Sequence, residues 1–364
     1  MEYRKLPRGD EMVSVLGLGN SSMGESGEYE TEASVSLALE NGINYFDMAT
    51  ADATPFAAFG RAVGSMREKV YYQVHFGALY DTGTYGWTLE LDAIKRSVDW
   101  QLRQLRSDYI DFGFIHCIDE NEDLDTAISE GTVDYLRSLK NDGTVRYIGM
   151  STHTPAAAMR ALDMGLLDVL MFSINPAYDY KRGEYGIGSV DERMELYRRC
   201  ERDGVGISVM KPFAGGQLLN ARTSPFKKAL SEYQCLQYAL DKPGVMTVLP
   251  GVRNREDLRR LLGFFEAGES ERDYSVIASF TPAEAEGVCV YCNHCQPCPA
   301  GLDVGLINKY YDLARAGDAL ARDHYMHLAR HASDCLHCGH CDSRCPFHAK
   351  QSERMSEIES YFGE

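Results

Sequence analysis

The chain has 364 residues, of which 44% are hydrophobic and 25% are charged, as in a globular protein. Its 37 basic and 54 acidic residues give a net charge of −17, which argues against a nucleic-acid surface and would repel anionic membranes. No apolar run reaches the about 18 residues of a membrane span, and the N-terminus lacks the apolar stretch of a signal peptide. We therefore expect a cytoplasmic protein with neither nucleic-acid nor membrane partners.

Up to about residue 262, short β-branched runs alternate eight times with amphipathic stretches. The predicted strands are residues 13–17, 45–48, 70–76, 109–116, 145–151, 167–174, 205–211 and 245–250. Their interiors are nearly continuous apolar runs, which is typical of parallel strands buried on both faces. Helices are predicted between them, among others over residues 89–105, 126–140 and 192–203. Eight such units favour a (β/α)8 TIM barrel, with an open doubly wound sheet as the alternative.

A change in composition near residues 265–288 marks a predicted domain boundary. Beyond it the hydrophobic periodicity fades, and eight of the eleven cysteines and seven of the ten histidines follow residue 288. We expect an α/β barrel over residues 1–265 and a small helical domain over residues 280–364. The many cysteines of a protein in a reducing compartment are expected to be ligands or free thiols rather than disulfides.

Two motifs account for the eight C-terminal cysteines. Each has three cysteines at every third position and then a fourth, three or four residues on, that precedes proline: Cys289, Cys292, Cys295 and Cys298, then Cys335, Cys338, Cys341 and Cys345. In two-cluster ferredoxins the cysteine before proline ligates the other cluster. The pattern therefore predicts two 4Fe–4S clusters in a ferredoxin-like domain. The first would be held by Cys289, Cys292, Cys295 and Cys345, and the second by Cys335, Cys338, Cys341 and Cys298.

Zinc is the alternative ligand for these cysteines, but four evenly spaced cysteines ending in Cys-Pro fit two CxxC pairs poorly. Seven histidines lie nearby and are expected at the surface or in packing, although a histidine ligand stays open: His294, His324, His327, His331, His337, His340 and His348. The clusters would either relay electrons or hold the segment together. A segment this short buries little core, so cluster ligation is expected to supply much of its stability.

Short motifs stand at corresponding places along nearly the whole chain: Gly17-Leu18-Gly19, Met23-Gly24, Asn41-Gly-Ile-Asn-Tyr-Phe-Asp47, Asp108-Tyr-Ile-Asp-Phe, His116, Ile148-Gly-Met-Ser151, Met210-Lys-Pro-Phe-Ala-Gly-Gly216 and Leu249-Pro-Gly-Val-Arg253. In these motifs the barrel resembles the aldo-keto reductase family, and specifically its subgroup with a C-terminal 4Fe–4S extension. The resemblance implies a (β/α)8 barrel that binds NADPH at its C-terminal face. It also implies carbonyl reduction by a tetrad of Asp, Tyr, Lys and His.

Carried over position by position, the resemblance places Asp47 and His116 at the family's Asp and His. The Tyr position holds Asp52 and the Lys position holds His75, so two of the four members are replaced. A histidine exchanges a proton near neutral pH, so His75 is a candidate proton donor in place of tyrosine. All four positions still hold titratable groups, which favours a repurposed site over an inactive one.

The resemblance also indicates a cofactor site. Its predicted residues are Ser151, Asn175, Lys211, Gly215, Gly216, Gly251 and Arg253. Ser151 and Asn175 follow strands five and six and are expected to contact the nicotinamide amide, while the paired glycines leave room for the pyrophosphate. The family's Arg position near the adenosine ribose holds Asp257, which would repel a 2′-phosphate. The choice between NADP and NAD therefore stays open.

These features together predict an iron–sulfur oxidoreductase acting on a small carbonyl or hydroxyl substrate with NAD(P)H, with electrons from the clusters, or with both. A ferredoxin- or flavoprotein-type electron partner is a candidate. Two alternatives stay open: a lyase or isomerase using Asp52, His75 and His116 with structural clusters, and a non-catalytic electron-transfer protein. Cys117, Cys200 and Cys235 are expected to be buried thiols of the barrel, with Cys117 nearest the site.

Overall fold

A closed eight-stranded parallel sheet forms the centre of the computed structural model, which describes residues 1–364 except 181–185, 281–286, 290, 292–294, 316–320 and 346. In order around the sheet the strands are β3 (Leu18–Gly19), β4 (Tyr45–Asp47), β5 (Tyr71–Phe76), β8 (Ile110–Ile115), β9 (Val145–Thr152), β10 (Val169–Ser173), β11 (Gly206–Met210) and β12 (Val245–Val248). Parallel bridges from Leu16 to Val248 and from Gly19 to Gly251 join the two edges. The predicted barrel is confirmed.

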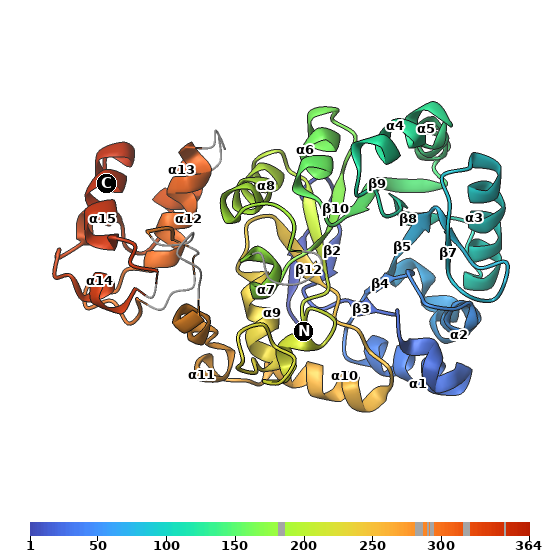
Figure 1. Ribbon diagram of the computed structural model, residues 1–364, viewed down its shortest axis with the longest axis horizontal. Helices are drawn as coiled ribbons and strands as arrows, with labels where there is room; N and C mark the ends of the chain where they lie inside the picture. The colour runs from blue at the N-terminus through green and yellow to red at the C-terminus, as the bar shows by residue number, and fades with distance from the viewer. Residues whose placement is uncertain (181–185, 281–286, 290, 292–294, 316–320, 346) are drawn as a thin grey trace.

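Helices surround the sheet (Figure 1). Those before residue 273 are α1 (Gly27–Glu40), α2 (Thr54–Val63), α3 (Leu91–Leu105), α4 (Asn121–Ser129), α5 (Thr132–Asp142), α6 (Pro155–Asp163), α7 (Pro176–Asp179), α8 (Val190–Arg202), α9 (Glu232–Leu240), α10 (Arg255–Leu262) and α11 (Glu269–Arg272). The helix predicted over residues 126–140 is divided into α4 and α5. Gly131 lies between them with a φ of +87°, a left-handed conformation that interrupts a helix.

The first predicted strand, residues 13–17, is shifted in the structure. The barrel begins with β3, and Val13 instead lies in β2 (Met12–Ser14), which pairs antiparallel with β1 (Tyr3–Lys5). Val13 and Leu6 are fully buried against Phe112 and Phe114 from the barrel interior. The apolar run at residues 13–17 is therefore explained by a hairpin that closes the barrel at the amino ends of its strands, its lower end.

The barrel interior changes from apolar to polar along its axis. Alternate residues of a strand point to the same face, so Phe112, Phe114 and His116 follow one another on β8 and its extension, as do Gln73 and His75 on β5. The phenylalanines pack near the hairpin, whereas the histidines and the glutamine lie nearer the carboxyl ends of the strands. This polar layer is where the (β/α)8 fold places active sites.

A second group of helices stands beside the barrel, next to α8 (Figure 1). It consists of α12 (Val304–Arg315), α13 (Ala321–Met326), α14 (His340–Arg344) and α15 (Gln351–Phe362). Ion pairs join α8 to α12: Lys309 lies 3.4 Å from Glu201, and Arg198 lies 3.6 Å from Asp312. The division into domains at residues 265 and 280 stays a prediction. None of the helices in the described parts of the chain is long and apolar enough to cross a membrane.

Candidate active site

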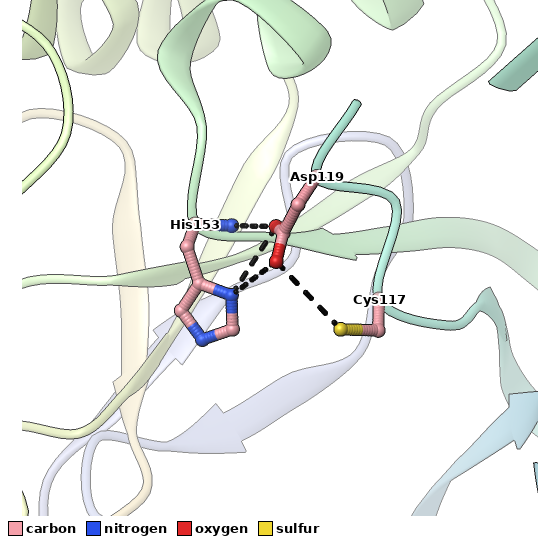
Figure 2. Close-up of side chains that lie close together, drawn as sticks. All are labelled: Cys117, Asp119 and His153. Atoms are coloured by element: carbon pink, nitrogen blue, oxygen red, sulfur yellow. Dashed lines mark hydrogen bonds and ion pairs between the residues drawn. The ribbon is translucent and has the colours of Figure 1, made fainter. Parts of the chain in front are cut away.

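The carboxyl ends of β8 and β9 bring three potential ligand side chains together. Cys117 follows β8, Asp119 lies two residues further on, and His153 follows β9 (Figure 2). The Asp119 carboxylate accepts hydrogen bonds from the His153 N–H at 2.6 Å and the Thr152 hydroxyl at 3.1 Å. These two contacts fix the carboxylate between the thiol and the imidazole.

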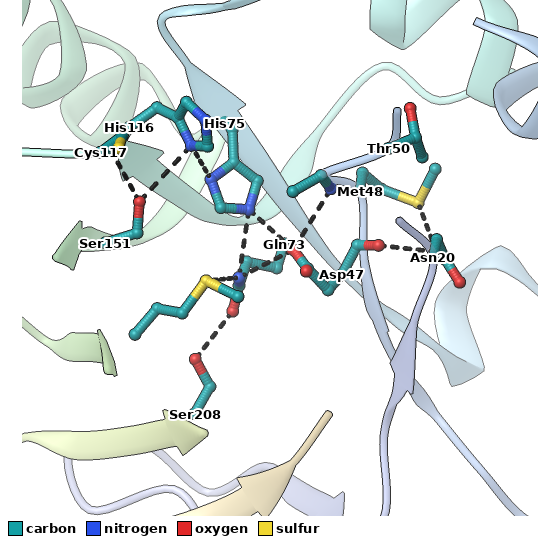
Figure 3. A network of polar contacts seen from close by, with 12 residues as sticks. Asn20, Asp47, Met48, Thr50, Gln73, His75, His116, Cys117, Ser151 and Ser208 are labelled. Carbon is teal, nitrogen blue, oxygen red and sulfur yellow. Dashed lines mark hydrogen bonds and ion pairs between the residues drawn. The ribbon is translucent and has the colours of Figure 1, made fainter. Parts of the chain in front are cut away.

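Beside this group, three of the four predicted catalytic side chains form a hydrogen-bonded line (Figure 3). His75 Nε2 lies 2.7 Å from Asp47 Oδ1, and His75 Nδ1 lies 2.8 Å from His116 Nδ1. Asp47 ends β4, His75 lies on β5 and His116 follows β8, so three adjacent strands supply the line. His75 is fully buried, and Asp47 and His116 are nearly so.

Gln73 orients the inner end of this line. Its amide oxygen accepts from the hydroxyls of Tyr45 at 2.7 Å and Ser208 at 3.0 Å, and its amide nitrogen donates to Asp47 Oδ1 at 3.0 Å. The backbone N–H of Ala49 donates to the same oxygen at 3.3 Å. Because Gln73 and Ala49 both donate to Oδ1, this oxygen is an acceptor, and Asp47 is the acceptor at the end of the line.

A tyrosine that the sequence analysis missed extends the line at its outer end. The Tyr85 hydroxyl lies 2.9 Å from His116 Nε2, and the indole N–H of Trp87 donates to the His116 carbonyl at 3.0 Å. Tyr85 precedes β7 (Gly86–Trp87), which pairs with β6 (Ala78–Leu79) in the loop after β5. The signal available in the sequence was an aromatic cluster in a loop that follows a strand, on the active-site face of a barrel.

The directions of these hydrogen bonds follow from Asp47. Because its oxygen accepts, His75 donates from Nε2, which leaves His75 Nδ1 to accept from His116 Nδ1 when both rings are neutral. His116 Nε2 then accepts from the Tyr85 hydroxyl. Burial lowers the pKa of His116 well below its ordinary 6.5, and the nearby His75 and His153 lower it further. Burial also raises the pKa of Tyr85, so its hydroxyl stays protonated at neutral pH.

Asp52, the fourth predicted catalytic residue, lies apart from this line. Its carboxylate accepts from the Thr54 backbone N–H at 2.8 Å at the start of α2, and it packs against Gly24. Within the described residues, no hydrogen bond joins the Asp52 carboxylate to Asp47, His75 or His116. The structure therefore gives Asp52 a local role at a helix start.

Comparison with known proteins identifies the family. The model of the family described as "Aldo/keto reductase family" matches residues 15–234. The chain belongs to the aldo/keto reductase family. The uncharacterized oxidoreductase YqkF of Bacillus subtilis is 27% identical over 293 residues, which are 71% of this chain and 89% of that protein. L-galactose dehydrogenase of Arabidopsis thaliana is 28% identical over 60% of this chain and 67% of that protein.

Solved structures agree on the fold. The aldo-keto reductase AKR11C1 from Bacillus halodurans, in its holo form, superposes with a TM-score of 0.63 at 24% identity, covering 78% of this chain and 97% of that chain. A putative aldo-keto reductase from Pseudomona aeruginosa superposes with a TM-score of 0.56 at 23% identity, covering 72% and 93%. With its family and its oxidoreductase relatives, the protein is an oxidoreductase.

In this aldo/keto reductase the two predicted nicotinamide contacts are held in place by the protein. Ser151 Oγ accepts from the Cys117 N–H at 2.8 Å and lies 3.4 Å from His116 Nδ1. Asn175 Oδ1 accepts from the Tyr178 N–H at 3.0 Å, and its Nδ2 donates to the Lys211 carbonyl at 2.8 Å. Asn175 is fully buried and Ser151 nearly so, so contact of either side chain with the nicotinamide stays a prediction.

The predicted glycines leave open space beside the backbone. Gly215 and Gly216 have φ angles of +64° and +87°, and a Cβ at either would meet nothing within 4 Å. The same holds for Gly251, next to the closing bridge of the barrel. Lys211 also has a positive φ, +55°, directly after β11. These positions fit a loop along which an extended ligand lies close to the backbone.

The predicted cofactor residue Arg253 is paired with an acid at the start of α10. Its Nε lies 2.8 Å from Asp257, and Arg260 lies 2.8 Å from the other carboxylate oxygen. The hydrogen bond from Arg253 lowers the pKa of Asp257 to about 2, so the carboxylate is ionised at neutral pH. Arg255 is paired likewise, at 2.9 Å from Glu30.

The described cysteines form the two groups expected from the sequence, three in the barrel and the rest in the C-terminal motifs. Cys200 and Cys235 are buried in the barrel, as predicted, and Cys117 is half-buried. Seven of the eight predicted ligand cysteines are described, whereas Cys292 lies outside the described residues, as does His294. The six described histidines of this segment are exposed or half-buried, as predicted.

The two cysteine motifs meet one another in space. Burial raises the pKa of Cys335, and the nearby thiols of Cys298 and Cys338 raise it further. Burial raises the pKa of Cys341 to about 11, with further contributions from Asp342 and Cys335. Cys298 belongs to the first motif and the others to the second, so the structure groups the four thiols expected at one cluster.

The other end of the first motif lies against the chain that follows the second. The Gly287 N–H donates to the Phe347 carbonyl at 2.6 Å. Burial raises the pKa of Cys289 to about 11, while a hydrogen bond from Gln351, in the first turn of α15, lowers it. The Phe347 ring stacks on Tyr180 of the barrel, with ring centroids 6.2 Å apart. Cys289 therefore lies near the segment that Cys345 begins.

Proposed function

We propose that this aldo/keto reductase interconverts a small carbonyl compound and its alcohol with a nicotinamide dinucleotide. The observation that carries the proposal is the hydrogen-bonded line from Asp47 through His75 and His116 to Tyr85. Its outer residue is 41% exposed and its inner residues are buried, so it leads from the barrel interior to the mouth. NAD(P)H, when bound, supplies the hydride, and the line supplies the matching proton.

For carbonyl reduction the line starts with one extra proton, on His75. The Asp47 carboxylate at 2.7 Å balances this charge. His75 then donates from Nδ1 to His116, and His116 donates from Nε2 to the Tyr85 oxygen, which leaves the Tyr85 hydroxyl free to donate to the substrate oxygen.

As the carbonyl carbon receives the hydride, the Tyr85 O–H bond breaks and its proton moves to the substrate oxygen. One proton then moves from His116 to Tyr85 and one from His75 to His116, so His75 ends neutral and the alcohol is complete. Alcohol oxidation runs through the same transfers in reverse. A tyrosine held by two histidines and an aspartate thus takes the place of the tyrosine and lysine that the resemblance implies.

For the dinucleotide, the start of α10 favours NADH over NADPH. The resemblance places the adenosine ribose there, and the 2′-phosphate of NADPH would meet the Asp257 carboxylate. Of the three cations that could offset it, Arg253 and Arg255 already hold Asp257 and Glu30, which leaves the exposed Arg259. We therefore propose that NADH binds at least as well as NADPH.

For the C-terminal segment we propose two 4Fe–4S clusters, with the ligand sets expected from the sequence. The mutual contacts of Cys298, Cys335 and Cys338 support exchange of the fourth ligand between motifs. Among the described residues, no three of these thiols lie within 4.8 Å of one another. A tetrahedral zinc site with bonds of about 2.3 Å needs sulfurs about 3.8 Å apart, so the wider spacing favours a cluster.

Electrons would leave or enter through the second cluster. Cys338 is exposed, and Leu336 beside it is 65% exposed, so this edge of the cluster would face a partner protein. A ferredoxin- or flavoprotein-type partner fits, because a cluster passes one electron at a time whereas a hydride carries two. Such clusters and free thiols suit the reducing cytoplasm.

The test of the barrel proposal is turnover of the anaerobically purified, cluster-containing chain with NADH and NADPH on a panel of small carbonyls. Tyr85→Phe is expected to lower kcat about 10²- to 10⁴-fold with dinucleotide affinity unchanged. Tyr29→Phe, at a tyrosine that is 81% exposed, is the matched control. Full activity of Tyr85→Phe, or turnover without nicotinamide, would contradict the proposal.

The test of the clusters is chemical analysis and electron paramagnetic resonance of the same preparation. We expect about eight iron and eight sulfide per chain, and spectra of reduced 4Fe–4S centres after addition of dithionite. Zinc in place of iron after anaerobic expression with added iron would overturn this part and leave the barrel proposal standing.

A further inference from the structure

Cys117, Asp119 and His153 are arranged as a set of metal ligands. Cys117 Sγ lies 3.7 Å from Asp119 Oδ2, and His153 Nδ1 lies 3.0 Å from the same oxygen and 3.2 Å from Oδ1 (Figure 2). One ligand atom from each of the three residues lies within 4.8 Å of the other two. Among the described residues, this is the one group of three histidine, cysteine or acidic side chains that meets this spacing.

Two of the three spacings are close to those of a tetrahedral zinc site, and the third pair, Cys117 with His153, lies within 4.8 Å. Bonds of about 2.3 Å to sulfur and about 2.1 Å to oxygen, at the tetrahedral angle, put these two ligand atoms about 3.6 Å apart. Bonds to nitrogen and oxygen put that pair about 3.4 Å apart. The observed separations of 3.7 Å and 3.0 Å differ from these values by a few tenths of an ångström, which small side-chain rotations can supply.

The surrounding residues fix two of the three ligands. The Asp119 carboxylate accepts from the Thr152 hydroxyl and the His153 backbone N–H, as the carboxylate ligands of metals commonly do. Cys117 has a φ of +55°, and its N–H donates to Ser151 Oγ at 2.8 Å. A left-handed backbone is rare for a residue other than glycine, and at functional sites such strain is often retained. Here it accompanies a thiol directed at Asp119.

The charges also suit a divalent cation. With the Cys117 thiol deprotonated, the thiolate and the Asp119 carboxylate together balance two positive charges. On binding, one proton is released: the thiol proton leaves to solvent, while the His153 proton stays on the ring and moves from Nδ1 to Nε2. Sulfur, nitrogen and oxygen donors in one site are typical of zinc.

We propose that Cys117, Asp119 and His153 bind a Zn²⁺ ion beside the line of histidines. Three protein ligands leave the fourth tetrahedral position for water or a substrate oxygen, as in catalytic zinc sites. Cys117 directly follows His116 in the chain, so the ion lies at the same end of the barrel as the proposed proton path. The site does not depend on the proposed hydride transfer or on the C-terminal clusters.

The test is zinc X-ray absorption of the cluster-containing full chain loaded with one equivalent of Zn²⁺ under anaerobic conditions. We expect one sulfur at about 2.3 Å and nitrogen or oxygen ligands at about 2.0–2.2 Å. A shell of four sulfurs means that zinc occupies the cysteine motifs instead and overturns the proposal. Zinc that dialysis removes completely overturns it as well.

Variants assign the ligands. Cys117→Ser and Asp119→Asn are each expected to weaken zinc binding at least about 100-fold, since even residues behind a ligand cost about 10- to 100-fold. Cys235→Ser, at a buried thiol elsewhere in the barrel, is the matched control. Circular dichroism identifies a variant that fails to fold. Unchanged zinc affinity in folded Cys117→Ser and Asp119→Asn overturns the assignment.

Discussion

The barrel mouth and the C-terminal cysteine segment hold their reactive groups in opposite ways. At the mouth, each group has a partner of complementary chemistry: Asp47 accepts from Gln73 and His75, and His116 contacts Tyr85. In the cysteine segment, like groups face one another: burial raises the pKa of Cys335, and the thiols of Cys298 and Cys338 raise it further. The chain alone can order the mouth, whereas the facing thiols of the cysteine segment would be balanced by the proposed clusters, beside a small apolar core that includes Ile307, Tyr325 and Phe362.

The largest effect should come from the cysteine that joins the two motifs. Cys298→Ser would remove the ligand that, as proposed, the first motif gives to the second cluster, so we expect iron content to fall by about half. If ligation of the proposed clusters stabilises this segment beyond its own apolar core, protease cleavage between α12 and α15 should become faster while the barrel stays intact. Iron analysis and limited proteolysis measure the two effects.

Cys200→Ser serves as the control, because Cys200 is a buried thiol in a helix that packs beside the same segment. It is expected to keep the full iron content. Retention of eight iron atoms by Cys298→Ser would show that the two motifs do not exchange ligands. It would contradict the proposal that the facing thiols of the two motifs share a cluster.

The second effect tests how firmly the barrel holds a buried charge. Arg193 Nε donates to Asp179 at 2.7 Å, and neither side chain is exposed. The Tyr197 and Tyr238 hydroxyls donate to the same carboxylate at 2.6 and 2.7 Å. Arg193→Met leaves the Asp179 charge without its cation, so we expect a loss of about 3–5 kcal/mol in the free energy of unfolding, measured with urea.

Two further variants show whether the charge is the cause. Adding Asp179→Asn to Arg193→Met removes the stranded charge and is expected to restore part of the stability. Arg137→Met breaks an exposed pair, with side chains 52% and 82% exposed, and should cost less than about 0.5 kcal/mol. Equal losses in the free energy of unfolding for Arg193→Met and Arg137→Met would contradict the view that the buried ion pair stabilises the barrel more than the exposed one.

Much of the barrel could be predicted from the sequence, because buried parallel strands leave a strong apolar signal. Seven of the eight expected strands overlap strands of the barrel, and the exception, residues 13–17, is apolar because Val13 closes the lower end. Motif positions also located Asp47, His75 and His116. Their residue types and their places at strand ends indicated a site before any distance was known.

The sequence could not show which side chains meet across loops. Tyr85 reaches His116 only because a short hairpin folds over the mouth, and the sequence of that loop has no motif that predicts it. Asp52 occupied the expected position by count, yet local geometry uses its carboxylate at the start of α2. His153 and Asp119 lie 34 residues apart, so their contact depends on the pairing of β8 with β9.

A smaller effect concerns acid stability at the barrel rim. The hydrogen bond from Arg253 lowers the pKa of Asp257 from 3.8 to about 2. The unfolded chain takes up this proton near pH 3.8 and the folded chain only near pH 2, so the contribution is present above 3.8 and is lost as the pH falls to 2. Because the Arg253 side chain is 59% exposed, we expect at most about 1 kcal/mol. Urea unfolding at pH 5 and pH 3, with Asp257→Asn as the comparison, measures it; equal pH dependence in both chains would contradict it.

The smallest effect concerns the choice of dinucleotide, and the same substitution tests it at neutral pH. Asp257→Asn removes the negative charge near the proposed 2′-phosphate position and frees Arg253 from its ion pair, so NADPH should bind about two- to fivefold more tightly relative to NADH. Fluorescence titration of both dinucleotides at two salt concentrations gives the ratio, and the gain should shrink at the higher salt because the interaction is electrostatic.

Glu256→Gln, one residue away on the exposed side of the helix, is the control for charge alone. If both variants shift the ratio equally, the general charge of the rim sets the preference; a shift confined to Asp257→Asn assigns it to the carboxylate that holds Arg253.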